Sequence, residues 1–120
     1  MIIQDIKWFC KESNQAFLIV MIHGIPCRIF CDFCDYKVGD VLRDPIFAYG
    51  VNCVYKSNKN HTQILSKNLD DEPHQIIAKV LDKQKWLVEL DTLIIYLQEY
   101  IPGDVDDGEY ISFFCKELTV

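Results

Sequence analysis

The residues of this 120-residue chain with the most obvious potential for chemistry are three closely spaced cysteines. Cys27, Cys31 and Cys34 follow the spacing C-x3-C-x2-C. Cysteine thiolates at short spacings are the ligands of iron–sulfur clusters and of tetrahedral zinc sites. A zinc site built on Cys31 and Cys34 would take its other ligands from Cys27, Cys10, Cys53 or a histidine, because the chain has no second C-x2-C pair.

The same spacing resembles the iron–sulfur motif of radical SAM enzymes, in which three thiolates hold a cluster and leave one iron site open. That resemblance implies a βα barrel around the cluster, and the chain shows no alternation of strand and helix patterns on that scale. Side-chain alternation along a strand also predicts Cys27 and Cys31 on one face and Cys34 on the other. We interpret the three cysteines as buried core thiols and expect no cofactor.

The second kind of chemistry to consider is nucleophilic catalysis by a cysteine thiol. Cys34 precedes Asp35, and His23 lies in the turn before it, so a thiol–imidazole pair is a possible assembly. A neighbouring carboxylate, however, raises the pKa of a thiol and lowers its thiolate fraction. With three histidines and six cysteines in the chain, some cysteine–histidine pairs are also expected by chance. We therefore predict that the protein is not an enzyme.

Carboxylates crowd a short stretch near the C-terminal end. Asp104, Asp106, Asp107 and Glu109 surround one predicted turn, and hard cations favour such oxygen ligands. The run lacks the EF-hand pattern, because Gly108 follows the third aspartate and no glutamate stands at the twelfth position. Two interpretations stay open, a solvated hairpin turn and an acidic contact surface for a basic partner. A second acidic run would extend that surface: Asp70, Asp71 and Glu72.

Composition restricts the class of partner. The chain has 18 acidic and 12 basic residues and a formal net charge of −6. Binding to a phosphate backbone depends on clustered lysine and arginine, so nucleic acid is a poor partner. A basic protein is a better one, since complementary charge accelerates association. The same charge also keeps a small domain soluble without any partner.

The sequence predicts a single cytoplasmic domain. Half of its residues are hydrophobic, which is enough for one core and too much for a disordered chain. The first residues have neither the basic nor the long apolar region of a signal peptide. The longest apolar run, residues 16–22, is far shorter than a membrane span. In the cytoplasm the six cysteines would be reduced thiols.

Strand patterns dominate the chain. Residues 16–22 form a continuous apolar run, residues 25–33 alternate, and His23-Gly24 between them predicts a hairpin. Polar residues predict a loop over 56–60. Further strands are predicted over residues 2–9, 46–49, 51–55, 74–81, 86–90 and 110–118. Residues 91–100 allow a helix, but the β-branched and aromatic run Ile94-Ile95-Tyr96 favours a strand.

Many short strands separated by glycine and proline turns indicate a small barrel or sandwich, and we expect an OB-like open barrel. The chain also contains a weak internal echo, because the same number of residues separates Phe17 from Trp86 and Gly39 from Gly108. Either the domain contains two similar β-units, or two unrelated hairpins match by chance.

Three segments resemble a group of small bacterial proteins associated with immunity against toxins of bacterial competition. They are Ile6-Lys7-Trp8, the turn 37–40 and the segment 101–113. The resemblance implies a non-catalytic β-protein that covers the active site of a toxin, and it transfers no catalytic residue.

The functional prediction is a non-catalytic protein-binding module, of the kind that neutralises a basic toxin. The alternative is an OB-like nucleic-acid-binding domain, in which exposed aromatic side chains stack on bases. The aromatic candidates are Trp8, Tyr36, Tyr49, Tyr55, Trp86, Tyr96 and Tyr100.

Overall fold

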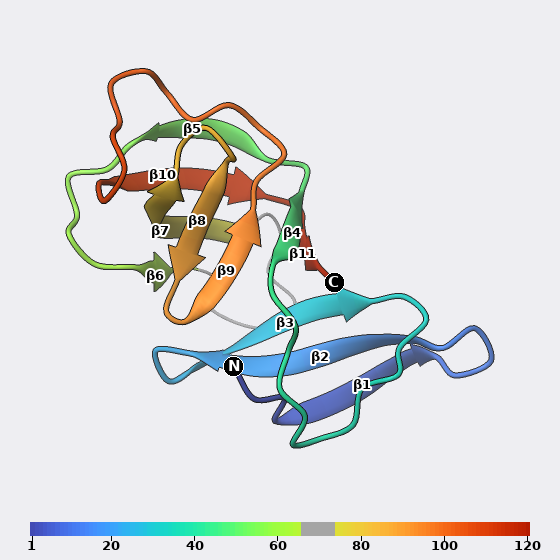
Figure 1. Cartoon of the computed structure of the whole chain (residues 1–120). Coiled ribbons are helices and arrows are strands. Elements are labelled where there is room, and N and C mark those ends of the chain that lie inside the picture. The colour runs from blue at the N-terminus through green and yellow to red at the C-terminus, as the bar shows by residue number, and fades with distance from the viewer. Residues whose placement is uncertain (66–73) are drawn as a thin grey trace.

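The computed structural model describes residues 1–65 and 74–120, and the regular secondary structure in these residues is entirely β-strand (Figure 1). The mostly-β class predicted from the sequence is confirmed. The strands are β1 (Asp5–Cys10), β2 (Gln15–Ile22), β3 (Ile25–Cys31), β4 (Ile46–Tyr49), β5 (Asn52–Lys56), β6 (Gln63–Ile64), β7 (His74–Asp82), β8 (Leu87–Leu90), β9 (Leu93–Tyr96), β10 (Tyr110–Cys115) and β11 (Glu117–Thr119). A search of the same residues for a helix long and apolar enough to cross a membrane finds none.

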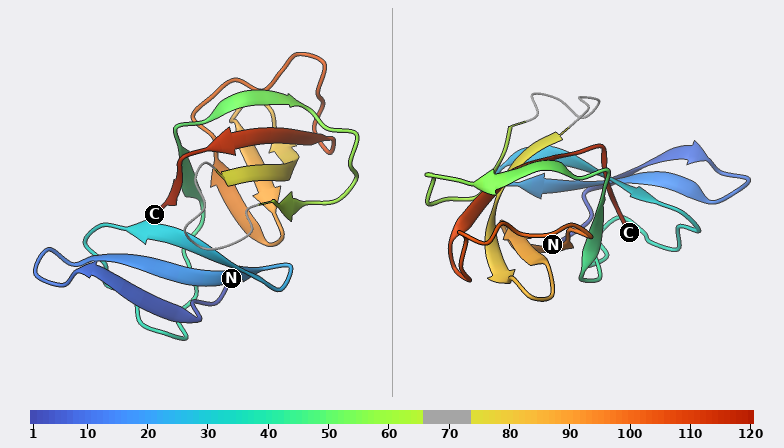
Figure 2. Two further views of the ribbon diagram at one scale, coloured as in Figure 1. Left: turned by 180° about the vertical axis from the view of Figure 1, so that it is seen from behind. Right: turned by 90° about the horizontal axis from the view of Figure 1, so that it is seen from above.

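The eleven strands belong to one sheet with the order β1-β2-β3-β11-β4-β9-β8-β7-β10-β5, and β6 pairs with β7 outside this path. The pairs β3–β11 and β4–β9 are parallel and the others are antiparallel. Among the described residues β1 and β5 each pair on one side only, so the sheet is curved but does not close into a barrel. Figures 1 and 2 show β1–β3 as one layer and the remaining strands wrapped into a second lobe.

Two antiparallel meanders form the larger part of the sheet. We call β1-β2-β3 the first meander and β7-β8-β9 the second meander. The first turn of each ends on a residue with positive φ, Asn14 at 56° and Trp86 at 59°. The carbonyl of Asn14 accepts a hydrogen bond from the N–H of Cys34 at 2.7 Å, and that of Trp86 accepts one from Leu97 at 3.0 Å. In each meander, a hydrogen bond therefore holds the segment after the third strand against the first turn.

A matching turn follows each meander, at residues 37–40 and 106–109. In the first, Asp40 N–H donates to the Lys37 carbonyl at 3.0 Å, and the Asp40 carboxylate accepts from Lys37 N–H at 2.8 Å. In the second, Glu109 N–H donates to the Asp106 carbonyl at 3.0 Å, and the Glu109 carboxylate accepts from Asp106 N–H at 2.9 Å. The carboxylate at the fourth position closes both turns.

Both turns also attach to the sheet through a glycine with positive φ. Gly39 N–H donates to the carbonyl of Ile3, and Gly108 N–H donates to the carbonyl of Val80. The φ angles are 94° and 87°, a region that L-residues with a Cβ rarely occupy. The two meanders and the turns after them thus share these hydrogen bonds. The residue that corresponds to Trp86 is Asn14, however, and not Phe17, which the sequence echo paired with it.

Most predicted strands are present in the structure, and residues 91–100 contain strand β9 and no helix. The bounds of some strands differ from the prediction. The strand predicted over 25–33 ends at Cys31. The predicted strand over 110–118 is two strands, because the chain bends at Lys116, whose N–H donates to the Tyr49 carbonyl at 2.8 Å. The strand predicted over 2–9 begins only at Asp5, and Ile2 forms an isolated bridge with Val41. The two-residue strand β6 was not predicted, since so short a segment has no periodicity to detect.

The core is one cluster of buried apolar side chains that includes residues of both meanders. On β2, Leu18, Val20 and Ile22 are fully buried and point into the core. On the other face of β2, Phe17 is half-buried and Met21 is exposed, whereas Ile19 is also buried. Each such side chain contributes about 1.5–3 kcal/mol through burial.

The two glycines of the 97–109 segment give a matched stability test. Gly108→Ala adds a Cβ where φ is +87°, so we expect a loss of about 1–2 kcal/mol in the free energy of unfolding. Gly103→Ala adds a Cβ in open space outside the left-handed region, so we expect no loss. Urea unfolding of both variants checks this. Equal effects of the two substitutions would contradict the turn geometry.

Candidate binding surface

The predicted acidic turn is an ordered part of the 97–109 segment between β9 and β10. One carboxylate oxygen of Glu109 accepts a hydrogen bond from Asp106 N–H. The other oxygen lies 3.1 Å from Lys56 Nζ and forms an ion pair with it. Asp107 Oδ1 accepts from the Lys83 N–H at 2.8 Å and so ties the segment to the β7–β8 turn. Two of the four predicted carboxylates therefore stabilise the local fold.

The side chains of Asp104 and Asp106 are exposed on the outside of this segment. Asp106 and Asp107 line an open hollow with the β7–β8 turn, where Asp82 Oδ1 accepts the N–H of Gln84 at 3.1 Å. No three metal-ligating side chains come together within the described part of the chain. The other predicted acidic run, Asp70, Asp71 and Glu72, lies outside the described residues.

The charge of Glu109 is favoured by its contacts. The hydrogen bond from Asp106 N–H and then the hydrogen bond from Lys56 hold the pKa of the Glu109 carboxyl below its ordinary value of 4.5. Because both donors stabilise the ionised form, the closed turn depends on a charged Glu109.

Four aromatic side chains form a continuous row beside the acidic turn, which we call the aromatic row. Phe47 of β4 contacts Tyr96 of β9 edge to face, with centroids 6.0 Å apart. Tyr96 stacks on Trp86 at 6.2 Å, and Trp86 meets Tyr100 at 5.0 Å with the rings inclined by 70°. Tyr100 is 75% exposed and Phe47 37% exposed. The row thus presents aromatic surface to solvent.

The aromatic row and the acidic turn belong to the same end of the molecule. Lys83 and Trp86 share the β7–β8 turn, and the ammonium of Lys83 donates to the carbonyl of Gly103 at 3.1 Å. Tyr100 and Gly103 belong to the segment that carries the acidic turn. Beside Tyr100, a hollow of about 310 Å³ is lined by Glu99 and residues 51–54. We call this region the acidic–aromatic surface: Phe47, Trp86, Tyr96, Tyr100, Asp104, Asp106 and Asp107.

Sequence reasoning named Trp86, Tyr96 and Tyr100 as separate aromatic candidates and missed Phe47. The missing information is the parallel pairing of β4 with β9, which places Phe47 opposite Tyr96. That pairing joins segments far apart in the chain, and no local pattern encodes it.

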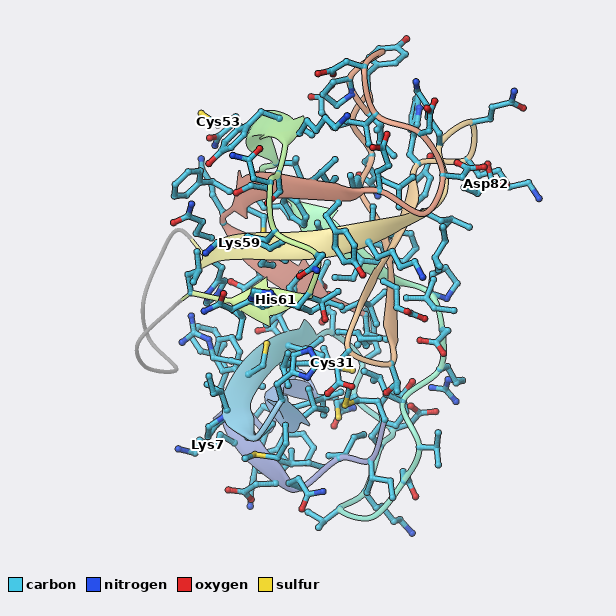
Figure 3. All side chains as sticks on the ribbon, turned by 90° about the vertical axis from the view of Figure 1, so that its left-hand side faces the viewer. Lys7, Cys31, Cys53, Lys59, His61 and Asp82 are labelled. Atoms are coloured by element: carbon cyan, nitrogen blue, oxygen red, sulfur yellow. The ribbon has the colours of Figure 1, made fainter. Side chains whose placement is uncertain are left out.

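The structure separates the three cysteines of the C-x3-C-x2-C motif into two places. Cys27 and Cys31 are four residues apart on β3, which puts their Cα atoms ~13 Å apart at ~3.3 Å per residue. Cys31 interacts with Cys34, and Cys27 lies near Cys115. Burial raises the pKa of Cys27, Cys31 and Cys115 to about 12, so these are protonated thiols. Figure 3 shows Cys31 inside the molecule and Cys53 at its periphery.

The prediction that Cys34 lies on the face opposite Cys31 is wrong. Strand β3 ends at Cys31, and Phe33 has a φ of 50°, which turns the chain sharply. Cys34 is therefore buried and interacts with the Cys31 thiol.

The neighbours of His23 differ from those that the sequence predicted. Its ring lies 2.6 Å from the hydroxyl of Thr62 and near the carboxylate of Asp91, not beside Cys34 and Asp35. No catalytic motif in the sequence marks Thr62 or Asp91.

Comparison with known proteins gives no match to a protein-family model, a curated sequence or a solved structure. The functional argument therefore rests on the surfaces of the molecule itself.

Thiol accessibility provides a direct check on the cysteine assignments. Cys53 is exposed, and the pKa of half-buried Cys10 is lowered by its hydrogen bonds with Ser13. We expect an aromatic disulfide reagent to modify these two promptly in the native protein at pH 8. The other four should react only after denaturation: Cys27, Cys31, Cys34 and Cys115. Prompt reaction of more than two thiols in the native state would contradict this assignment.

The lowered pKa of Glu109 predicts a pH-dependent contribution to stability. A carboxyl whose pKa is depressed by folding stabilises above its unfolded value and loses that effect as the pH falls through its folded value. The free energy of unfolding of Glu109→Gln should be lower than that of the native protein at pH 7, and the difference should shrink steadily below about pH 4.5. Urea unfolding between pH 3 and pH 7 measures it.

Glu12→Gln in the β1–β2 turn is the control, since it removes the same charge from the other lobe. A Glu109→Gln difference that stays constant down to pH 3 would show that the ionised carboxylate is not what closes the turn.

Proposed function

We propose that the protein is a binding module for a basic protein partner and that the acidic–aromatic surface is the contact. The observation that carries this proposal is the aromatic row, with Phe47 and Tyr100 exposed, beside the carboxylates of the 97–109 segment. Tryptophan and tyrosine are the residues most enriched among interface hot spots, because they bury a large area at a small cost in conformational entropy.

The charge supports a cationic partner. The chain carries a formal net charge of −6. The carboxylates of Asp104 and Asp106 lie exposed on the same segment as Tyr100. An arginine side chain from a partner would stack on Trp86 or Tyr100 and reach a carboxylate with its guanidinium group. Such pairs raise the association rate and fix the orientation of the complex.

The particular role that we favour is neutralisation of a basic toxin by covering its active site. The support is the resemblance of three short segments to immunity proteins, together with the position of one of them. The segment 101–113 contains the acidic turn that forms one side of the acidic–aromatic surface.

A second surface favours the alternative, a nucleic-acid contact. On the first meander, Phe9, Phe17 and Phe30 form a row with centroid separations of 6.0 and 5.6 Å. The guanidinium of Arg28 lies 4.4 Å from the Phe17 ring centre, and Lys7 is the register partner of Phe17. Aromatic side chains interleaved with cations are what single-stranded nucleic acids require. The acidic net charge makes this the weaker candidate.

One set of variants tests both candidates. The immobilised protein is exposed to lysate of its native host at low and at high salt, and the retained partner is then purified and titrated. We expect a basic protein, whose affinity falls at least tenfold with Tyr100→Ala and with Asp106→Asn. Asp106 suits this test because its backbone, and not its carboxylate, closes the turn.

Phe9→Ala is the matched control, because Phe9 is 67% exposed and lies on the first meander. It should leave protein binding unchanged. Capture of nucleic acid that is lost with Phe9→Ala and retained with Tyr100→Ala would overturn the proposal in favour of the alternative.

A further inference from the structure

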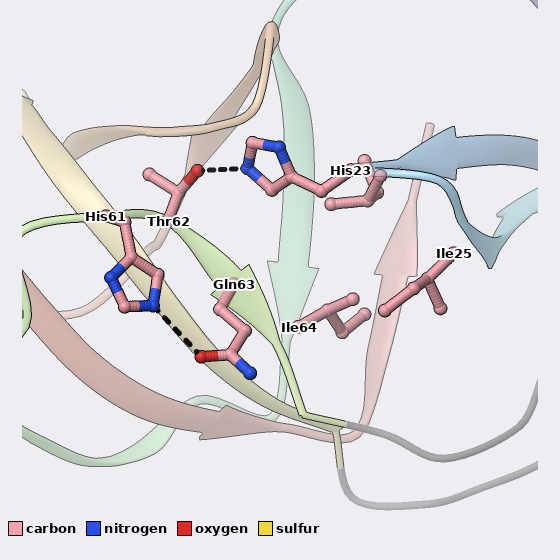
Figure 4. A pocket seen from close by; sticks show the side chains of 7 residues that line it. His23, Ile25, His61, Thr62, Gln63 and Ile64 are labelled. Atoms are coloured by element: carbon pink, nitrogen blue, oxygen red, sulfur yellow. Dashed lines mark hydrogen bonds between the residues drawn. The ribbon is translucent and has the colours of Figure 1, made fainter.

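A closed ring of hydrogen bonds lies where three loops meet, away from the acidic–aromatic surface. Its members are His23 of the β2–β3 turn, Thr62 before β6 and Asp91 of the β8–β9 turn. Thr62 Oγ1 is 2.6 Å from His23 Nε2. Figure 4 marks this hydrogen bond with a dashed line. His23 N–H donates to Asp91 Oδ2 at 3.0 Å, and Asp91 N–H donates to Thr62 Oγ1 at 3.1 Å. The two meanders therefore contribute to one cluster.

The hydrogen bonds of the ring allow the hydroxyl proton to point at the imidazole. Thr62 Oγ1 accepts a hydrogen bond from Asp91 N–H, and its own proton remains available to His23 Nε2. In the tautomer whose Nε2 is unprotonated, the hydroxyl donates to Nε2 and Nδ1 carries the ring proton. Nδ1 lies 3.8 Å from Asp91 Oδ2, so the carboxylate stands beside the nitrogen that carries the proton in this tautomer.

This is the order of groups that activates a hydroxyl nucleophile. A hydroxyl within hydrogen-bond reach of an imidazole, which is in turn oriented by a carboxylate, is recognised by its geometry and not by the fold that carries it. Distances in such clusters are often longer before substrate binds than during the reaction.

Thr62 and His23 both line a pocket. The pocket has a volume of about 410 Å³, which is in the range of small-molecule sites. Ile22, Ile25 and Ile64 supply apolar walls, and His61 and Gln63 line it together with His23 and Thr62. Figure 4 shows these side chains around the opening. An apolar wall beside a hydroxyl suits a short acyl chain whose carbonyl carbon faces that oxygen.

We propose that Thr62, His23 and Asp91 form a hydrolytic site for small esters of short-chain carboxylic acids. Thr62 Oγ1 attacks the ester carbonyl carbon while His23 Nε2 takes the hydroxyl proton, and a tetrahedral intermediate forms. The carbon–oxygen bond to the alcohol then breaks, and His23 returns the proton to the departing alcohol. This leaves the acyl group on Thr62. A water molecule, deprotonated by His23, attacks the acyl-threonine and releases the carboxylic acid and the free hydroxyl.

The test uses p-nitrophenyl acetate and p-nitrophenyl butyrate with the full chain. We expect hydrolysis above the buffer rate, reduced about 100-fold or more by Thr62→Ala and by His23→Gln, in line with the ~10²–10⁴-fold contribution of a general base. Thr62→Ser retains a hydroxyl and should retain activity. Thr92→Ala is the matched control, because it removes an exposed hydroxyl beside Asp91 and outside the ring. It should leave the rate unchanged.

Asp91 acts through His23 and is a positioning residue. Asp91→Asn should lower kcat and leave KM unchanged, whereas a general loosening of the loops would raise KM as well. Mass spectrometry of the native protein quenched during turnover should find the acyl group on Thr62. Hydrolysis that is equal in the native protein and Thr62→Ala, or acylation only at residues other than Thr62, would overturn the proposal.

Discussion

The pairing of β11 between β3 and β4 is the constraint on which the rest of the structure depends. This strand has three residues, yet in the sheet it is the link between the first meander and the strands that follow. Thr119 is the partner of Phe30 on β3 and of Phe47 on β4, and Leu118 is fully buried between them. The N–H of Val120 donates to the carbonyl of Phe30 at 2.9 Å and extends the seam by one residue. The last strand of the chain therefore joins elements that the earlier chain leaves apart.

Both proposed sites depend on this connection. Phe47 enters the aromatic row because β4, held by β11 on one side, pairs with β9 on the other. The ring of His23, Thr62 and Asp91 needs the β2–β3 turn of the first meander beside the β8–β9 turn of the second. One face presents carboxylates and aromatic side chains, and the other holds a hydroxyl, an imidazole and a carboxylate at a pocket. Neither assembly exists within a single meander.

Local chemistry predicted much of the fold. The apolar run and alternation on either side of His23-Gly24 predicted the β2–β3 hairpin, and the β-branched run before Tyr96 predicted strand β9. What local patterns could not supply is pairing at a distance. The break at Lys116 arises because its N–H finds the Tyr49 carbonyl, and Cys34 returns to Cys31 because Phe33 takes a positive φ. Thr62 belongs to no catalytic motif, and only the fold brings it to His23. The sequence predicted the acidic turn. It could not predict that the carboxylates of Asp107 and Glu109 accept hydrogen bonds that stabilise the turn.

The most direct test of this account is whether the two meanders unfold together. The chain has two tryptophans, Trp8 on β1 and Trp86 in the β7–β8 turn, so Trp86→Phe and Trp8→Phe leave one fluorescent reporter in each meander. In urea unfolding, the fluorescence of each variant should change in a single transition. Its midpoint should coincide with that of the far-UV circular dichroism of the same variant. Fluorescence of Trp8 or Trp86 that changes at a urea concentration different from the loss of β-structure would contradict the claim that β11 makes one cooperative unit of the sheet.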